Sequence, residues 1–246
     1  MKHILKYFFS ILLILCSLNM NSQNKKNNDT VKILPKIDRY GLRIGVDLFK
    51  LSRSVYDKNY KGLELAGDFR FSKKYYFAAE IGNENKTTNE AQLNFTTKGT
   101  FLKVGFDYNT HQNWLNLENM IYIGLRFGIS SFNQEINTYK VYNSNPFFNE
   151  SNTIVLNQKF DGLSAQWGEV VAGIKTKVFD NVFVGFSLRG NILFSNKKPA
   201  GFDNLYIPGF NRTYDGNFGV GFNYTVSYFL PIYKKKSIPK EKIKKK

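Results

Sequence analysis

Few residues in this sequence could carry out acid–base, nucleophilic or metal chemistry. After the first 35 residues the chain holds one histidine, His111, and no cysteine, which leaves almost nothing for a His/Cys metal site or a cysteine nucleophile. Glu64 and Asp68 could act as a general acid and base, but salt bridges explain both carboxylates more simply. We therefore expect no catalytic residues, no cofactor and no metal site, and we do not expect an enzyme.

Charged residues of both signs recur at every second position of segments that are otherwise apolar. Alternate side chains of a β-strand point to the same face, so the charges of a segment lie opposite its large apolar residues. Ten of them form a candidate charge network: Arg43, Glu64, Asp68, Arg70, Glu80, Lys103, Asp107, Arg126, Glu169 and Arg189. Inside a narrow barrel these side chains would pair and fill the lumen, because an unpaired buried charge is costly. The functional alternative is a small polar passage, which the mixture of signs disfavours.

Eight segments show this alternation, and their length of about ten residues suits a tilted transmembrane strand. They are residues 41–48, 63–71, 75–82, 102–108, 119–132, 166–179, 181–194 and 218–230. The pattern predicts an all-β fold, an eight-stranded antiparallel transmembrane β-barrel of the outer-membrane type. A soluble sandwich or a lipocalin-like barrel would carry the opposite polarity, with apolar residues inside and polar residues outside.

The connections between the segments alternate in length. Residues 72–74 and 179–181 are tight turns, the first connection, near 52–60, is intermediate, and three connections are expected to be long loops: 83–94, 133–165 and 195–215. Bacterial outer-membrane barrels have short turns on the periplasmic side and long loops outside the cell. An even number of strands then places both termini in the periplasm.

The loop at 195–215 is unusually rich in apolar residues: Phe202, Leu205, Tyr206, Ile207, Phe210 and Tyr214. So many large side chains are not expected in a loop that is simply solvated. They could cover the barrel mouth as a lid, or they could anchor a partner protein. The two alternatives are compatible, and the lid is preferred.

The two ends of the chain carry most of its net charge of +16, and only +4 falls between Tyr40 and Tyr233. Residues 1–22 have the layout of a secretory signal peptide, with cleavage before Gln23. We predict a flexible periplasmic segment at 23–39, the barrel at 40–233 and a lysine-rich periplasmic tail at 234–246. In an exported protein the tail suits anionic lipid, cell-wall polymer or a partner protein better than nucleic acid.

Long stretches of the chain resemble a known family. They are NWLNLENMIYIGLRFGISSF, FDNLYIPGFNRTYDGNFGVGFNYTVSYFLPIYKK and YGLRIGVDLFKLSRSVYDKNYKGLELAGDFR. These runs are similar to an uncharacterised family of Bacteroidota outer-membrane barrels, known as a domain of unknown function. The similarity covers Tyr40 to Lys236, and its most specific part runs from Phe202 to Gly216. It implies a barrel in the bacterial envelope and supplies no catalytic residues.

Together these features favour a non-enzymatic outer-membrane protein, exported by a cleaved signal peptide, that is a structural or interaction component of an envelope complex. Its expected partners are outer-membrane lipid and another outer-membrane or periplasmic protein. One alternative is a small transport barrel or channel for ions or apolar molecules. Another is an envelope anchor that binds cell-wall polymer or anionic lipid through the lysine tail.

Overall fold

The computed structural model describes residues 36–111, 118–141, 147, 153–212 and 216–237. The predicted signal peptide, residues 23–35, Tyr214 and the lysine tail after Ser237 lie outside these residues. The described residues all belong to the second compact unit of the chain, Lys36–Lys246.

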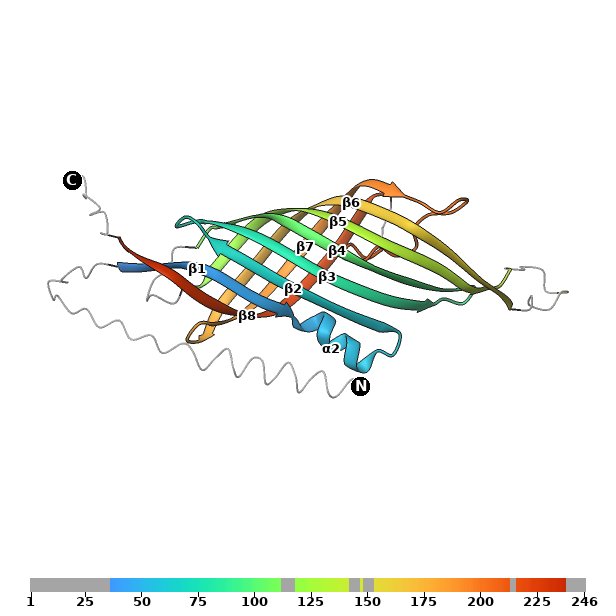
Figure 1. Ribbon diagram of the computed structural model, residues 1–246, viewed down its shortest axis with the longest axis horizontal. Helices are drawn as coiled ribbons and strands as arrows, with labels where there is room; N and C mark the ends of the chain where they lie inside the picture. The colour runs from blue at the N-terminus through green and yellow to red at the C-terminus, as the bar shows by residue number, and fades with distance from the viewer. Residues whose placement is uncertain (1–35, 112–117, 142–146, 148–152, 213–215, 238–246) are drawn as a thin grey trace. The chain divides into compact units, whose positions relative to one another are not determined.

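Eight antiparallel strands form a closed barrel, with neighbours in sequence order (Figure 1). They are β1 (Lys36–Asp47), β2 (Tyr60–Arg70), β3 (Tyr75–Asn89), β4 (Leu93–Asn109), β5 (Met120–Tyr139), β6 (Ile154–Phe179), β7 (Val182–Lys197) and β8 (Phe218–Ser237). The ring closes because β1 pairs with both β2 and β8, which removes the free sheet edges that an open sheet would expose. The predicted all-β fold with eight antiparallel strands is confirmed.

The apolar residues face outward and the charged residues face the lumen. On β5, five apolar side chains from Ile121 to Ile129 keep exposed fractions between 41% and 65%, whereas Tyr122 and Arg126 between them are buried. The least regular segment, β6, follows the predicted phase, with Glu169 buried and Val170 exposed. This polarity is the reverse of that in a soluble sandwich or a lipocalin-like barrel.

Glycines on the inward face make room for large aromatic side chains of the neighbouring strand. Gly128 pairs with Trp167, and Gly173 pairs with Tyr122. A Cβ atom at Gly128 would lie 2.3 Å from Trp167 Cε2, and one at Gly173 would lie 2.6 Å from Tyr122 Cζ. The indole and the phenol therefore lie flat across positions where any side chain would collide with them.

Strands β3 to β6 continue far beyond their predicted segments, and the prediction of a long loop at 83–94 is wrong. Strand β3 continues to Asn89 and β4 begins at Leu93, so only residues 90–92 connect them. Strands β5 and β6 also run well into the region predicted as the loop 133–165. The extensions of β3, β4 and β5 are polar on their outer face, and the extension of β6 exposes the consecutive apolar residues Ile154, Val155 and Leu156. Hydrophobic alternation therefore does not reveal any of them. Cross-strand pairing stabilises them instead, as between the hydroxyls of Thr87 and Thr96, 2.9 Å apart.

The first connection contains a helix that the sequence analysis missed. Helix α2 (Leu48–Tyr56) follows β1 directly, and its N-cap Asp47 accepts hydrogen bonds from the backbone N–H groups of Phe49 (2.7 Å) and Lys50 (3.2 Å). Within the described residues, no helix combines the length and the apolar character needed to cross a membrane.

The strands extend past the predicted barrel limits at Tyr40 and Tyr233. Asp38 pairs with Lys235 and Arg39 pairs with Lys234 in the β1–β8 ladder. The first residues of the predicted lysine tail and the last residues of the predicted N-terminal segment are therefore part of the sheet, at the rim where β1 begins and β8 ends.

Candidate functional site

The inward face of the barrel holds the predicted charge network. All ten side chains are buried, and each forms at least one ion pair: Arg43, Glu64, Asp68, Arg70, Glu80, Lys103, Asp107, Arg126, Glu169 and Arg189. Each strand from β1 to β7 contributes at least one of them. The network thus ties opposite walls of the barrel together across the lumen.

Two glutamates form the centre of the network. Arg189 Nη1 lies 2.6 Å from Glu80 Oε2 and 2.9 Å from Glu169 Oε2, so one guanidinium bridges two carboxylates. Lys103 Nζ lies 3.1 Å from Glu169 Oε1, and Trp167 Nε1 donates a hydrogen bond of 2.7 Å to the same oxygen. Charge-assisted contacts of this length compensate much of the cost of burying the carboxylates.

A second group of charges lies nearer the rim where β1 begins and β8 ends. Asp68 is bound by Arg43 at 2.9 Å and by Lys175 at 2.6 Å. The guanidinium of Arg43 also lies 5.0 Å from the centre of the Phe183 ring, within cation–π range. Arg126 pairs with Asp107 at 2.7 Å. These anions, like the central ones, have cationic partners.

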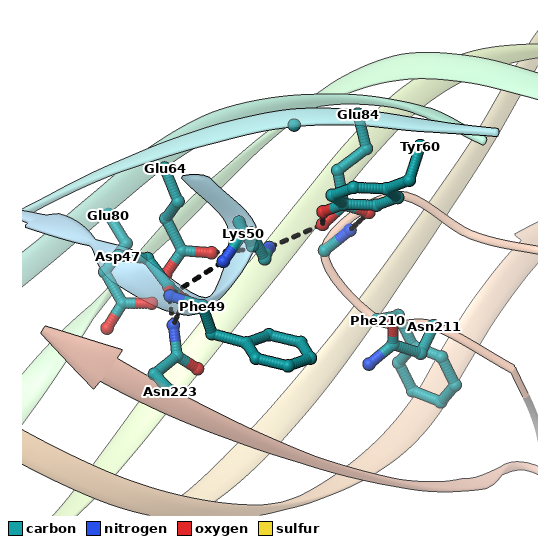
Figure 2. A network of polar contacts seen from close by, with 12 residues as sticks. Asp47, Phe49, Lys50, Tyr60, Glu64, Glu80, Glu84, Phe210, Asn211 and Asn223 are labelled. Atoms are coloured by element: carbon teal, nitrogen blue, oxygen red, sulfur yellow. Dashed lines mark hydrogen bonds and ion pairs between the residues drawn. The ribbon is translucent and has the colours of Figure 1, made fainter. Parts of the chain in front are cut away.

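A third group lies nearer the opposite rim and centres on a residue of α2. Lys50 Nζ lies 2.6 Å from Glu64 Oε2 and 2.6 Å from Glu84 Oε1 (Figure 2). Asn223 Nδ2 donates to Asp47 Oδ2 (2.5 Å) and to Glu64 Oε1 (2.7 Å). A single ammonium therefore holds two buried carboxylates that come from different strands.

The pKa shifts of Lys50 and Tyr206 agree with their contacts to the buried glutamates. Burial alone would lower the pKa of Lys50, but the Glu64 and Glu84 carboxylates outweigh it and raise the pKa above its ordinary value, so the ammonium stays charged. Burial, and then the charge of Glu84, raise the pKa of the Tyr206 hydroxyl well above its usual range. The phenol remains protonated and donates to Glu84 Oε2 at 2.5 Å.

Sequence reasoning missed Lys50 and Glu84. Glu84 fell in a segment predicted as a loop, and Lys50 stood just after the end of a predicted strand. A helical signal was present, because Lys50, Arg53, Ser54 and Asp57 recur at intervals of three and four residues. Nine residues are too few to make such a pattern decisive.

The loop between β7 and β8 plugs the barrel mouth. Tyr206, Ile207 and Phe210 have exposed fractions of 2% or less. Ile207 and Phe210 pack in an apolar cluster on the lumen wall that includes Phe101 and Trp167, and the Phe210 and Trp167 rings meet edge to face at 5.8 Å.

The remaining predicted loop residues lie around this plug. Phe202 and Leu205 are partly exposed, and the Phe202 ring contacts the Phe160 ring at 5.0 Å. Tyr214 lies outside the described residues. The buried members of the set form a lid, and they could reach a partner protein only if the loop left the barrel.

A small cavity remains between the central charges and the group around Asp68. Its volume is about 30 Å³, room for on the order of two water molecules. Its charged lining includes Arg43, Asp68, Glu80 and Arg189, and small residues such as Gly45 and Ala66 form much of the remaining wall. The cavity has room for water between fixed charges. The charged side chains that line it already pair with one another.

The described part of the chain contains no group of three or more His, Cys, Asp or Glu side chains arranged to hold a metal ion. His111 lies at the rim where β1 begins and β8 ends, and its backbone N–H donates to Asn109 Oδ1 at 3.1 Å.

Comparisons with known proteins identify a family without a described activity. No curated protein matches the chain. The fold is similar to that of Ail, the attachment invasion locus protein of Yersinia pestis, at 12% identity and a TM-score of 0.39, over 78% of this chain and 97% of Ail. It is also similar to Neisserial surface protein A, at 10% identity and a TM-score of 0.37, over 79% of this chain and 98% of that protein. Residues 4–235 match a family model described as a domain of unknown function, DUF6048, and the chain belongs to that family.

Proposed function

We propose that this protein spans a bacterial outer membrane as a closed, plugged β-barrel and is a non-enzymatic structural or interaction component of the envelope. The observation that carries the proposal is the polarity of the barrel wall, with apolar side chains exposed outside and ion pairs buried inside. In water such an exposed apolar band would be unfavourable, whereas in a bilayer it is the required surface.

The dimensions of the band support this placement. On β5 it runs from Ile121 to Ile129, which spans roughly 21 Å along the barrel axis at a strand tilt of about 40°. Beyond it, the exposed polar residues Asn83, Thr100 and Ser131 pair side by side across β3, β4 and β5. They mark one edge of a band close to the ~25 Å typical of outer-membrane barrels.

The orientation of the barrel in the membrane is inferred from the positions of its first and last strand ends. The start of β1 and the end of β8 lie at one rim, which we assign to the periplasm, with the extended parts of β3–β6 outside the cell. The expected export signal and the resemblance to Bacteroidota barrels support an envelope of that phylum. The lysine-rich sequence after Ser237 is the proposed contact with anionic lipid or cell-wall polymer.

The interaction role is assigned to the extension of β5 and β6. Residues 154–162 of β6 continue past the last pairing with β7 at Ser164 and pair only with β5. Along this segment Ile154, Val155 and Leu156 have exposed fractions of 40%, 66% and 42%. Apolar side chains on a strand with an open edge are suited to contact another protein.

Purification from native membranes in mild detergent tests this role. We expect a second envelope protein in fixed ratio with the wild-type chain, and a recovery about tenfold lower with Val155→Lys, corresponding to ~1.4 kcal/mol of binding free energy. Gln158→Lys, which adds the same charge at another exposed position of β6, should retain the partner. A protein that elutes alone from native membranes would count against an interaction role.

The channel alternative makes a different prediction. The lumen holds two groups of ion pairs beneath the plug and the Lys50 group, so we expect no stepwise conductance in planar bilayers from the wild-type protein. Phe210→Ala should also remain silent, because it removes only part of the plug and leaves the charges around Glu80 and Asp68 in place. Steady single-channel steps from the wild-type protein would favour the channel.

A further inference from the structure

Helix α2 is amphipathic with an inverted orientation, because its polar face is the one that contacts the barrel. Lys50 reaches Glu64 and Glu84 in the lumen. Arg53 lies 4.3 Å from the centre of the Tyr60 ring. Ser54 Oγ accepts a hydrogen bond from Gly62 N (2.7 Å) and donates one to Gly62 O (3.0 Å). These contacts attach the helix to the rim of the barrel through its charges and hydroxyls.

The apolar face of the helix points away from the protein. The exposed fractions of Leu51, Val55 and Tyr56 are 42%, 85% and 69%, and no residue of α2 is fully buried. A short helix of a soluble protein would normally turn this face to the core. Here the burial that usually stabilises such a helix is missing within the chain.

This face continues the outward apolar band of the barrel. In Figure 1, α2 follows the end of β1 at the margin of the barrel. The Phe49 ring contacts the Phe222 ring of β8 at 4.5 Å, and Phe222 belongs to the band, with an exposed fraction of 46%. Leu48 directly follows β1, whose Ile44 is also exposed on the band.

We propose that α2 is a membrane-interface helix whose apolar face inserts among the acyl chains of the outer leaflet, at the rim opposite the start of β1 and the end of β8. The inference rests on the proposed membrane location and adds a lipid contact outside the ring of strands. An amphipathic helix with this polarity lies in the plane of the interface and buries its apolar face a few ångströms below the headgroups.

Lipid fits this surface better than a protein partner does. A specific protein interface uses roughly 20 or more residues on each side, whereas the exposed face of α2 offers three large side chains. Lys58 and Lys61 are exposed just after the helix, where they can meet the phosphates of lipid headgroups. The position at the edge of the apolar band is where the boundary between acyl chains and headgroups is expected.

Site-specific fluorescent labelling tests the proposal. The only cysteine of the sequence is Cys16, so Cys16→Ser provides a background for single cysteines at Val55, at Leu125 on the centre of the band, and at Gln92 as the aqueous control. Gln92 is exposed in the connection between β3 and β4, at the tip of their polar extension. Each variant carries a polarity-sensitive nitrobenzoxadiazole label and is reconstituted in phosphatidylcholine vesicles. Nitroxide groups are placed either near the headgroup or near the end of the acyl chain, and cooperative unfolding in urea confirms that each labelled barrel is intact.

We expect the label at Val55 to be quenched by the shallow nitroxide about threefold more than the label at Gln92, as for an interfacial helix. The label at Leu125 should respond most to the deep nitroxide. If Leu125 responds and Val55 behaves like Gln92, the helix is in water and this inference is wrong, although the membrane barrel stands. A Val55 label with blue-shifted emission but no quenching is covered by protein, which also overturns the inference. If Leu125 itself is not quenched, the proposed membrane location fails.

Discussion

Lys50→Met is expected to lower the free energy of unfolding of the barrel by about 3–5 kcal/mol, the usual cost of removing one partner from a buried ion pair. Lys50 lies 2.6 Å from both Glu64 and Glu84, whose side chains are essentially buried. The methionine has a similar length but no charge, so two carboxylates would share the same rim of the lumen without their common cation. Urea unfolding of the refolded protein in lipid vesicles, followed by fluorescence, measures the change.

A second substitution separates charge from packing. In the Lys50→Met background, Glu84→Gln should recover part of the lost stability, because it removes one of the two uncompensated charges. Lys58→Met is the control, since it removes an exposed lysine just after the same helix and should change stability by less than about 0.5 kcal/mol. Equal effects of Lys50→Met and Lys58→Met would show that the ion pairs of Lys50 do not stabilise the barrel.

Leu125→Arg is expected to destabilise the lipid-embedded barrel by about 2–4 kcal/mol, the cost of an arginine at the midplane of a membrane barrel. Leu125 is the central residue of the exposed series on β5, with an exposed fraction of 65%. Most of its side chain is exposed among the described residues, so a loss of stability cannot come from a cavity in the core. The loss arises only if hydrocarbon surrounds this position.

The matched control lies on the same strand. Asn133 also faces outward but belongs to the polar extension of β5 beyond Ser131, and Asn133→Arg should cost less than about 1 kcal/mol. Both variants add the same side chain to the same face of one strand, so the difference between them reports depth in the bilayer. If Leu125→Arg were as stable as Asn133→Arg in vesicles, the outward band would not be the lipid-facing surface.

Lys50→Met tests the charges that the barrel encloses, and Leu125→Arg tests the surface that it presents to the membrane. A membrane barrel must present apolar side chains to hydrocarbon, and it must also satisfy whatever charges it encloses. In this protein the ion pairs and the plug fill the lumen, with a central guanidinium between Glu80 and Glu169. The small cavity beside them has room for only on the order of two waters, which fits a rigid scaffold better than a transport path.

The sequence by itself determined the fold and the division of side chains between the two faces. Alternation along each strand has a period of two, so a single residue such as Arg126 between Leu125 and Phe127 fixes the phase of the whole segment. All ten predicted charges are buried for this reason. The same local rule places Gly128 inward, although only the pairing with β6 explains why that position must lack a side chain.

Only the tertiary structure decided which charges meet, how far the strands extend and what fills the mouth. Glu84 and Lys50 are distant in sequence, and their contact depends on the register of β3 and on a short helix held mainly by interactions with the barrel. The extensions of β3 to β6 show no alternation of polar and apolar residues, because neither lipid nor a core selects their outer face. Phe210 could have been a lid or a partner anchor on sequence grounds, and its packing on Trp167 could be seen only once the loop was placed inside the ring. Alternation is a property of neighbouring residues, so the sequence reveals it directly. These contacts join distant segments, which come together only when the barrel closes.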